Sequence, residues 1–340
     1  MNWREAHEEA MFAAAEAHED LAVDTGREID VFAAIESIGL ELLFRPLAGA
    51  AGLYLSPNAD RPGGILINSK HRRARQRYTG GHELGHHLMG HSPSLEPEDR
   101  GDGAPSEELP PEEKLAEAFA AWFLMPPELV DKVMDDLGLR RPAGPADVYA
   151  LALRLGTSFE ATALHLPNLK LAQPNEAREW ASTPLKRVKE ALCEGRPSSS
   201  YRGDVWALSA KEDKVRLALT AGDRLVLTLP GSPARYGTAI LKVVTDTGIE
   251  EMLDGARTVE DGIGEGSGLR RVIVDFGQDD IGDFRLVIPS EVNSLPGLSE
   301  GTFVLELDVH PLDLGRRTDA AAVTTNEPAG SISPITGPGR

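Results

Sequence analysis

The segment TGGHELGHHLMG, residues 79–90, constrains the fold and chemistry of this chain more than any other stretch. Within it, His82, Glu83 and His86 form the pattern H-E-x-x-H. Because residues four apart lie on one face of an α-helix, both histidines can direct a ring nitrogen to one metal ion. Glu83 would lie beside that ion, where its carboxylate can take a proton from water. The pattern predicts a helix that carries a divalent-metal centre; a helix of solvent-exposed histidines is the alternative.

A second pair of histidines in the same segment has the same spacing but lacks the acid. His87 and His91 are four apart, yet Leu88 stands where Glu83 stands in the first set. The metal-binding interpretation therefore applies to the first set only.

Three glycines, Gly80, Gly81 and Gly85, interrupt the motif helix. Each costs about 1 kcal/mol relative to alanine in a helix interior. Such glycines are usually tolerated where another backbone must come close. We therefore expect tight packing beside the metal, with a distorted helix as the alternative.

Length and composition limit the class of protein. At 340 residues the chain is too long for one ordinary core, and two or three domains are expected. The single cysteine, Cys193, excludes an internal disulfide and fits a reducing compartment. The sequence has no signal-peptide pattern and no apolar run of about 20 residues, so we expect a soluble cytoplasmic protein without a membrane partner. A formal charge of −19 opposes nonspecific nucleic-acid binding by the whole molecule.

The first domain, residues 1–135, mixes helices with short strands. The expected helices are residues 4–22 and 31–38, and the expected strands are residues 40–44, 52–55 and 65–68. Strand 65–68 is expected at a sheet edge, to which an extended substrate segment can add. The basic run 70–77 has no interleaved aromatic residues, so a solvent-exposed helix face is favoured over a nucleic-acid patch. Residues 92–111 are rich in proline, glycine and acids and are expected to form a mobile loop.

A catalytic zinc normally has three protein ligands, so the motif helix needs a partner. A helix is expected after residues 110–111, Pro-Pro, and before residues 126–127, also Pro-Pro. In it, Glu113 and Glu117 share a face with the small residues Ala116 and Ala120, which let the helix lie close to another. This pairing suits one ligand carboxylate and one carboxylate that orients a ligand histidine. For Glu113 the alternative is a solvated helix start.

The order IDVFAAIESIGLEL, GGILINS, RQRYTGGHELGHHLMGH and EKLAEAFAAWFLMPPE resembles the ImmA/IrrE family of zinc metallopeptidases, over about residues 29–130. The resemblance implies a zincin-like domain in which His82, His86 and Glu113 hold Zn²⁺ and Glu83 is the general base. Mn²⁺ or another divalent ion is the alternative in the cell. The family usually has Glu-Ala-Asn where this chain reads Leu-Ala-Glu at residues 115–117. Whether Glu117 orients a ligand or is itself the ligand therefore stays open.

Residues 136–190 are expected to form a helical module. Two short helical segments flank residues 156–158, Gly-Thr-Ser, in an arrangement that resembles a helix-turn-helix. Across residues 140–190, 8 Lys and Arg stand against 5 Asp and Glu, a local net charge of +3. DNA contact is thus an option, but a small packed module is favoured. His165 is expected to be a partly exposed helix residue rather than a ligand.

Residues 191–204 are expected to be a linker, and residues 205–317 alternate between apolar and polar residues like the strands of a mixed sheet. We interpret them as an α+β domain. Because they hold no convincing cluster of histidine, cysteine and carboxylate, a sensory role with an unidentified signal ligand is more plausible than catalysis. Residues 318–340 are expected to be a disordered tail.

The predicted fold class is therefore α+β multidomain. The family resemblance adds a helix-turn-helix segment and a GAF-like C-terminal domain. It also implies a protein substrate, the transcriptional repressor DdrO, whose cleavage switches on DNA-damage-response genes after radiation or desiccation. The favoured function is a metal-dependent endopeptidase. The alternative is a DNA-binding transcriptional regulator whose metal site is structural or vestigial.

Overall fold

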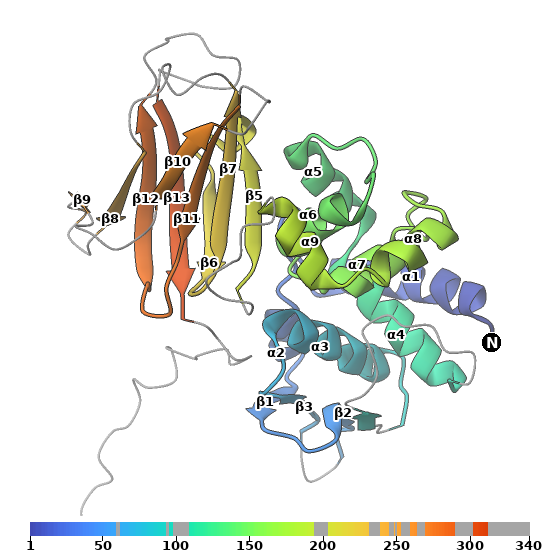
Figure 1. The fold of residues 1–340 in the computed structure, drawn as a ribbon. Coiled ribbons are helices and arrows are strands. Elements are labelled where there is room, and N and C mark those ends of the chain that lie inside the picture. Colours follow the sequence, from blue (N-terminus) through green and yellow to red (C-terminus); the bar gives the residue numbers. More distant parts are fainter. Residues whose placement is uncertain are drawn as a thin grey trace, which may run out of the picture.

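The computed structural model describes two regions, a helix-rich N-terminal region and a C-terminal β-sandwich (Figure 1). The described residues are 1–58, 62–92, 95–97, 109–193, 203–230, 239–244, 248, 250–252, 259–263, 269–289 and 302–311. The predicted tail, most of the predicted loop 92–111 and most of the predicted linker 191–204 lie outside them. Within the described part of the chain, the helices are all too short or too polar to cross a membrane.

The predicted helices and strands of the first domain are confirmed. The helices are α1 (Trp3–Asp20), α2 (Val31–Ser37), α3 (Arg73–Leu88) and α4 (Pro111–Leu124), and the strands are β1 (Glu41–Arg45), β2 (Ala50–Leu55), β3 (Gly64–Asn68) and β4 (Leu95–Pro97). The sheet order is β1-β3-β2-β4. Since β3 pairs with β1 on one side and β2 on the other, the prediction that residues 65–68 form a sheet edge is wrong. Alternating polarity shows that a strand is half buried, but it does not show which strands lie beside it.

Small residues bring the helices of this region close together. α1 begins with a capping box between Asn2 and Glu5 and buries a stripe of alanines at positions 6, 10, 14 and 17. This stripe packs on α4. Residues 114–124 of α4 are all buried, because α1, α3 and α7 surround this helix. The sequence predicted an apolar core face opposite the glutamates, whereas the structure buries the whole circumference, including Glu117.

The basic run before the motif is not a uniformly exposed face, which corrects that prediction. Arg77 is fully buried in α3; its Nε donates to Gly156 O at 2.8 Å and its Nη1 lies 2.9 Å from Glu28 Oε1. Burial lowers the pKa of Arg77 to about 10, against the opposing effect of the Glu28 charge. The guanidinium therefore remains charged at neutral pH and ties the motif helix to the residue that follows α6 (Pro145–Leu155).

The remaining helices of the N-terminal region include the pair that the sequence predicted around residues 156–158. These helices are α5 (Pro127–Leu137), α6, α7 (Phe159–His165), α8 (Pro174–Ala181) and α9 (Leu185–Leu192). Gly156, at φ +65°, ends α6, and the Ser158 side chain accepts from Ala161 N at 3.1 Å to begin α7. Only Glu160 of α7 is exposed. A helix-turn-helix fold is not confirmed by this arrangement, and α7 offers no exposed basic face for reading DNA.

His165 is buried, with 2% of its surface exposed, so the prediction of a partly exposed residue is wrong. Its ring lies edge-on to Trp122 at a centroid distance of 4.7 Å. α7 covers this end of α4, an approach between distant segments that the local sequence pattern does not reveal.

The C-terminal region consists of two sheets that share one core (Figure 1). Its elements are β5 (Val205–Ser209), the 3-10 helix η1 (Ala210–Glu212), β6 (Arg216–Thr220), β7 (Arg224–Pro230), β8 (Ile240–Val244), β9 (Glu250–Met252), β10 (Val259–Ile263), β11 (Leu269–Asp275), β12 (Gly282–Pro289) and β13 (Thr302–His310). The sheet orders are β10-β11-β7-β5 and β6-β13-β12-β8-β9. Alternating burial in β12 and β13 confirms the predicted strand pattern.

An α+β, GAF-like fold is not confirmed for this domain. From residue 203 onward, the described residues contain strands and one 3-10 helix but no α-helix. The two sheets cover each other's apolar faces, as in a β-sandwich. Val205, Val226 and Ile273, on β5, β7 and β11, belong instead to the core of the helical region. Alternation in sequence identifies half-buried strands, but it does not distinguish a covering sheet from a covering helix.

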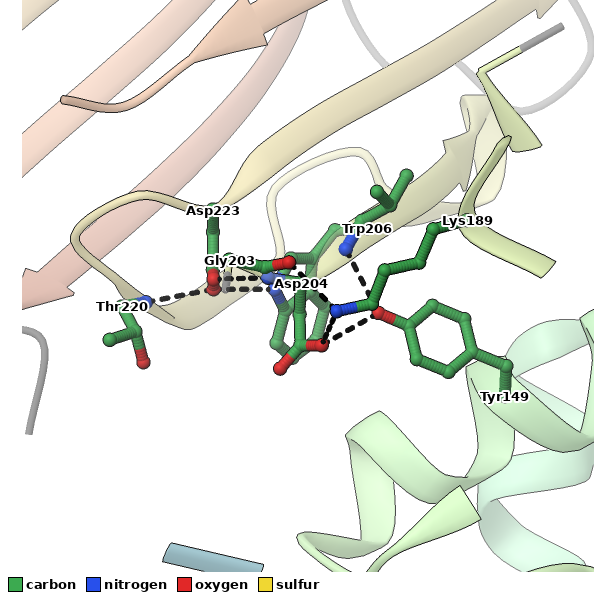
Figure 2. A network of polar contacts seen from close by, with 8 residues as sticks. Tyr149, Lys189, Gly203, Asp204, Trp206, Thr220 and Asp223 are labelled. Carbon is green, nitrogen blue, oxygen red and sulfur yellow. Dashed lines mark hydrogen bonds and ion pairs between the residues drawn. The ribbon is translucent and has the colours of Figure 1, made fainter. Parts of the chain in front are cut away.

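A polar network joins the helices to the sandwich (Figure 2). Asp204 Oδ1, just before β5, accepts from Tyr149 OH on α6 at 2.8 Å and lies 2.8 Å from Lys189 Nζ on α9. Asp204 N in turn donates to Asp223 Oδ1 at 2.7 Å. Burial, and then the Asp204 charge, raise the pKa of Asp223 to about 6. α6 therefore contacts β5 through Tyr149, while the residue after its C-terminal end contacts α3 through Arg77.

Candidate metal centre

Glycine and alanine let α3 and α4 lie against each other, as the sequence predicted. A Cβ atom added to Gly81 would lie 3.3 Å from Ala120 Cα, and one added to Gly85 would lie 3.0 Å from the Phe119 ring. Both distances are shorter than ordinary carbon contacts. The absence of side chains at these two positions therefore sets the spacing between the motif helix and the helix that carries Glu113.

Three predicted residues converge between these helices. His82 and His86 are each 1% exposed, and their Nε2 atoms lie 3.1 Å apart. Glu113 Oε2 lies 3.5 Å from His82 Nε2, and Glu113 Oε1 lies 3.4 Å from His86 Nε2. One donor atom from each residue lies within 4.8 Å of the other two. The structure thus brings together two imidazole nitrogens and one carboxylate.

This donor set fits a divalent metal ion. Tetrahedral zinc with bonds of about 2.0–2.1 Å holds neighbouring ligand atoms about 3.3 Å apart. The separations between these nitrogen and oxygen atoms, 3.1 to 3.5 Å, bracket that value. Neutral imidazole and carboxylate are also the ligand types that catalytic zinc sites use. His82, His86 and Glu113 could therefore hold one ion without rearrangement of the backbone.

Glu117 lies on the other side of the His82 ring. Its Oε2 is 3.2 Å from His82 Nδ1, whereas Glu113 faces His82 Nε2. A carboxylate in this position can orient the imidazole and favour the tautomer with hydrogen on Nδ1. Of the two roles that the sequence left open for Glu117, the geometry favours the orienting one.

Glu83 is buried completely and lies against the sheet. A Cβ atom added to Gly52 of β2 would lie 3.0 Å from Glu83 Oε1 and 2.3 Å from Thr79 Cγ2. Only glycine leaves room here for the carboxylate and the strand. No sequence pattern singles out Gly52, because the approach between β2 and α3 is a tertiary contact.

His91 was not expected to take part in the site, yet its Nδ1 lies 3.0 Å from His86 Nδ1. Burial lowers the pKa values of both histidines, and the charge of Glu113 opposes the shift in each. The neighbouring His87 points elsewhere, and its Nδ1 lies 2.9 Å from Tyr54 OH. One sequence feature, the glycine before His91, could have predicted this position, because glycine after a helix allows the chain to turn back over the helix end.

The family model of the IrrE N-terminal-like domain matches residues 35–166. This range includes α3 and α4 with the whole candidate centre. The match supports the ImmA/IrrE family for this part of the chain and a metallopeptidase-like function, as the sequence resemblance implied. It includes α6 and α7 but ends before the β-sandwich.

The other comparisons add no functional information. No curated protein matches the chain. Among solved structures, the cysteine protease inhibitor EhICP2 from Entamoeba histolytica is 14% identical with a TM-score of 0.23, and the match covers 32% of this chain and 96% of that chain. Amebosin is 13% identical with a TM-score of 0.19, and the match covers 32% of this chain and 98% of that chain. The ZIG-8 IG1 homodimer is 11% identical with a TM-score of 0.18, and the match covers 38% of this chain and 99% of that chain.

Proposed function

We propose that this protein is a metal-dependent endopeptidase in which His82, His86 and Glu113 bind Zn²⁺. The observation that carries the proposal is the convergence of two histidine Nε2 atoms and a glutamate carboxylate between two tightly packed helices. Mn²⁺ or another divalent ion is the alternative in the cell. When bound, the ion would polarise the scissile carbonyl and lower the pKa of a water molecule.

Glu83 is the proposed general base. It follows His82 directly on α3, and its buried carboxylate lies against Gly52 of β2. In this role the carboxylate takes a proton from the attacking water and then passes it to the nitrogen of the leaving amine. His82 and His86 must be neutral to serve as ligands, so activity falls in acid.

The proposed binding mode for the substrate is addition of an extended peptide at the β4 end of the sheet. Among the described strands of this sheet, β4 lies at the edge and pairs with β2. β2 in turn carries Gly52, which lies against Glu83. Backbone hydrogen bonds to an edge strand hold a peptide extended. This mode replaces the sequence expectation that residues 65–68 provide the edge.

The proposed substrate is a DdrO-like transcriptional repressor in the cytoplasm. Its support is the family-model match over residues 35–166, together with the sequence resemblance to IrrE, also called PprI, the Deinococcus regulator of the radiation and desiccation response. Cleavage would inactivate the repressor and release DNA-damage-response genes. The C-terminal sandwich is the proposed site for an unidentified signal ligand.

The experiment is incubation of the purified protein and Zn²⁺ or Mn²⁺ with a purified DdrO-like repressor, followed by mass mapping of the products. Glu83→Gln keeps the shape of the side chain but removes the base. We expect cleavage to slow by about 10²- to 10⁴-fold, with metal content unchanged. Cleavage by Glu83→Gln at the wild-type rate would contradict the mechanism.

The second candidate function is a DNA-binding regulator with a structural metal site. The observation that favours it is the net charge of +3 across residues 140–190 in a chain of −19. Against it, α7 buries most of its surface. A salt titration of promoter binding separates the two, because phosphate contacts make the binding constant fall steeply with salt.

A further inference from the structure

The C-terminal end of the motif helix brings His91 back over the proposed metal site. α3 ends at Leu88, and Gly90 adopts the left-handed conformation at φ +68°. Gly90 N donates to His87 O at 3.1 Å, and His91 N donates to His86 O at 2.9 Å. These two bonds define a Schellman motif, in which the residue after the glycine packs on the last full turn. Position 91 is therefore fixed beside position 86 by the backbone.

The side chains meet through their Nδ1 atoms. His86 Nδ1 and His91 Nδ1 are 3.0 Å apart, with ring centroids 5.1 Å apart and planes at 69°. One of the two nitrogens must carry the hydrogen. His86 Nε2 faces Glu113 and His82, so as a metal ligand it must offer a lone pair. The hydrogen then belongs on His86 Nδ1, and His91 Nδ1 is the acceptor.

We propose that His91 is a positioning residue for the metal centre. By accepting a hydrogen bond from His86 Nδ1, it holds the tautomer and ring orientation in which Nε2 faces the ion. This inference rests on the proposed function. His91 would orient the ring of His86 as Glu117 orients the ring of His82, whose Nδ1 lies 3.2 Å from Glu117 Oε2.

Charge explains why an imidazole suits this position. Three carboxylates, Glu83, Glu113 and Glu117, already lie in or beside the centre. A fourth carboxylate at position 91 would add repulsion among groups that are largely buried. A neutral imidazole supplies the acceptor atom without adding negative charge.

The experiment measures the dissociation constant for Zn²⁺ by competition between a chromophoric chelator and the full-length apo-protein. His91→Phe keeps a ring but removes the acceptor, and we expect it to weaken Zn²⁺ binding by about 10- to 100-fold. His91→Asn places an amide oxygen near the position of Nδ1, so its affinity should stay within a few-fold of wild type. His87→Phe is the matched control, because His87 contacts Tyr54 rather than a proposed ligand, and its affinity should be unchanged.

A second readout follows the tautomer itself. In the apo-proteins at neutral pH, long-range ¹H–¹⁵N spectra should show the hydrogen of His86 on Nδ1 in wild type and His91→Asn, and a smaller fraction of this tautomer in His91→Phe. If His91→Phe binds Zn²⁺ as tightly as wild type, or if His91→Asn is as weak as His91→Phe, the positioning role is wrong and the proposed function stands. If wild type binds no Zn²⁺, the proposed function fails instead. Should His91→Phe not fold, His91→Ala, which also lacks the acceptor, takes its place in the same titration, and an affinity equal to that of wild type would show that the positioning role is wrong.

Discussion

Two pairs of histidines lie in the helical part of the molecule, and different groups surround them. His82 and His86 face the carboxylate of Glu113, with Glu117 behind the first ring. His7 and His165, with ring centroids 6.5 Å apart, pack against indoles. The ring centroids of Trp3 and His7 lie 5.9 Å apart, and those of Trp122 and His165 lie 4.7 Å apart. His82, His86 and His165 are buried and His7 is half-buried. Among the described residues, carboxylate oxygens lie beside the ring nitrogens of the first pair.

The surroundings give the second pair a structural role. Burial lowers the pKa of His7 to about 4, against the opposing charge of Glu117. Burial and then the charge of His7 lower the pKa of His165 to about 3. Asn168 Nδ2 lies 3.4 Å from a nitrogen of each ring. The pair is therefore neutral at pH 7, and the comparison shows that two adjacent histidines with lowered pKa values do not by themselves make a metal site.

The largest expected difference between the pairs is in metal binding. His82→Ala removes a proposed ligand and should weaken Zn²⁺ binding by more than about 100-fold, the upper end for residues that only orient a ligand. His165→Phe keeps a ring beside Trp122 and should leave the Zn²⁺ affinity within a few-fold of wild type. Competition titration of both apo-proteins is the measurement. Equal losses in the two variants would remove the distinction between the pairs.

Glu113 and Glu117 of α4 allow a ligand to be distinguished from an orienting group at the first pair. Glu113→Gln should weaken Zn²⁺ binding more than Glu117→Gln, because Glu113 faces both Nε2 atoms whereas Glu117 faces Nδ1 of His82. For Glu117→Gln we expect a loss of about 10- to 100-fold. The same titration tests this order, and a larger loss for Glu117→Gln would make Glu117 the ligand.

The smallest effect is on the stability of the apo-protein in acid. The folded pKa of His165, about 3, is below the unfolded value of 6.5, so the unfolded state binds more protons between these values. Stability therefore falls as pH falls through this window, by about 2 kcal/mol for His165 between pH 7 and pH 5. His165→Phe should lose correspondingly less stability than wild type over that range. Urea unfolding at both pH values measures the difference, and an identical drop in the two proteins would show that His165 is not held neutral.

The sequence predicted the parts of the site that depend on one helix or on family resemblance. The H-E-x-x-H spacing placed His82 and His86 on one face, and the small residues of α3 and α4 predicted their close approach. The helix face shared by Glu113, Glu117 and two alanines offered both glutamates as candidates, and the resemblance selected Glu113 as the ligand.

The remaining features depend on tertiary contacts. His7 and His165 lie on α1 and α7, so no spacing in the sequence brings them together. The burial of Arg77 requires the carbonyl of Gly156, and the role proposed for His91 requires the turn at Gly90. In the C-terminal domain, alternating polarity predicted the strands, but it did not reveal that a second sheet covers them.

The most direct test of the metal centre is anomalous diffraction at the zinc edge from crystals of the Zn²⁺-loaded protein. We expect one strong peak about 2.0–2.2 Å from His82 Nε2, His86 Nε2 and a carboxylate oxygen of Glu113. We expect no peak between His7 and His165. A peak at other residues, or no peak between α3 and α4, would contradict the assignment.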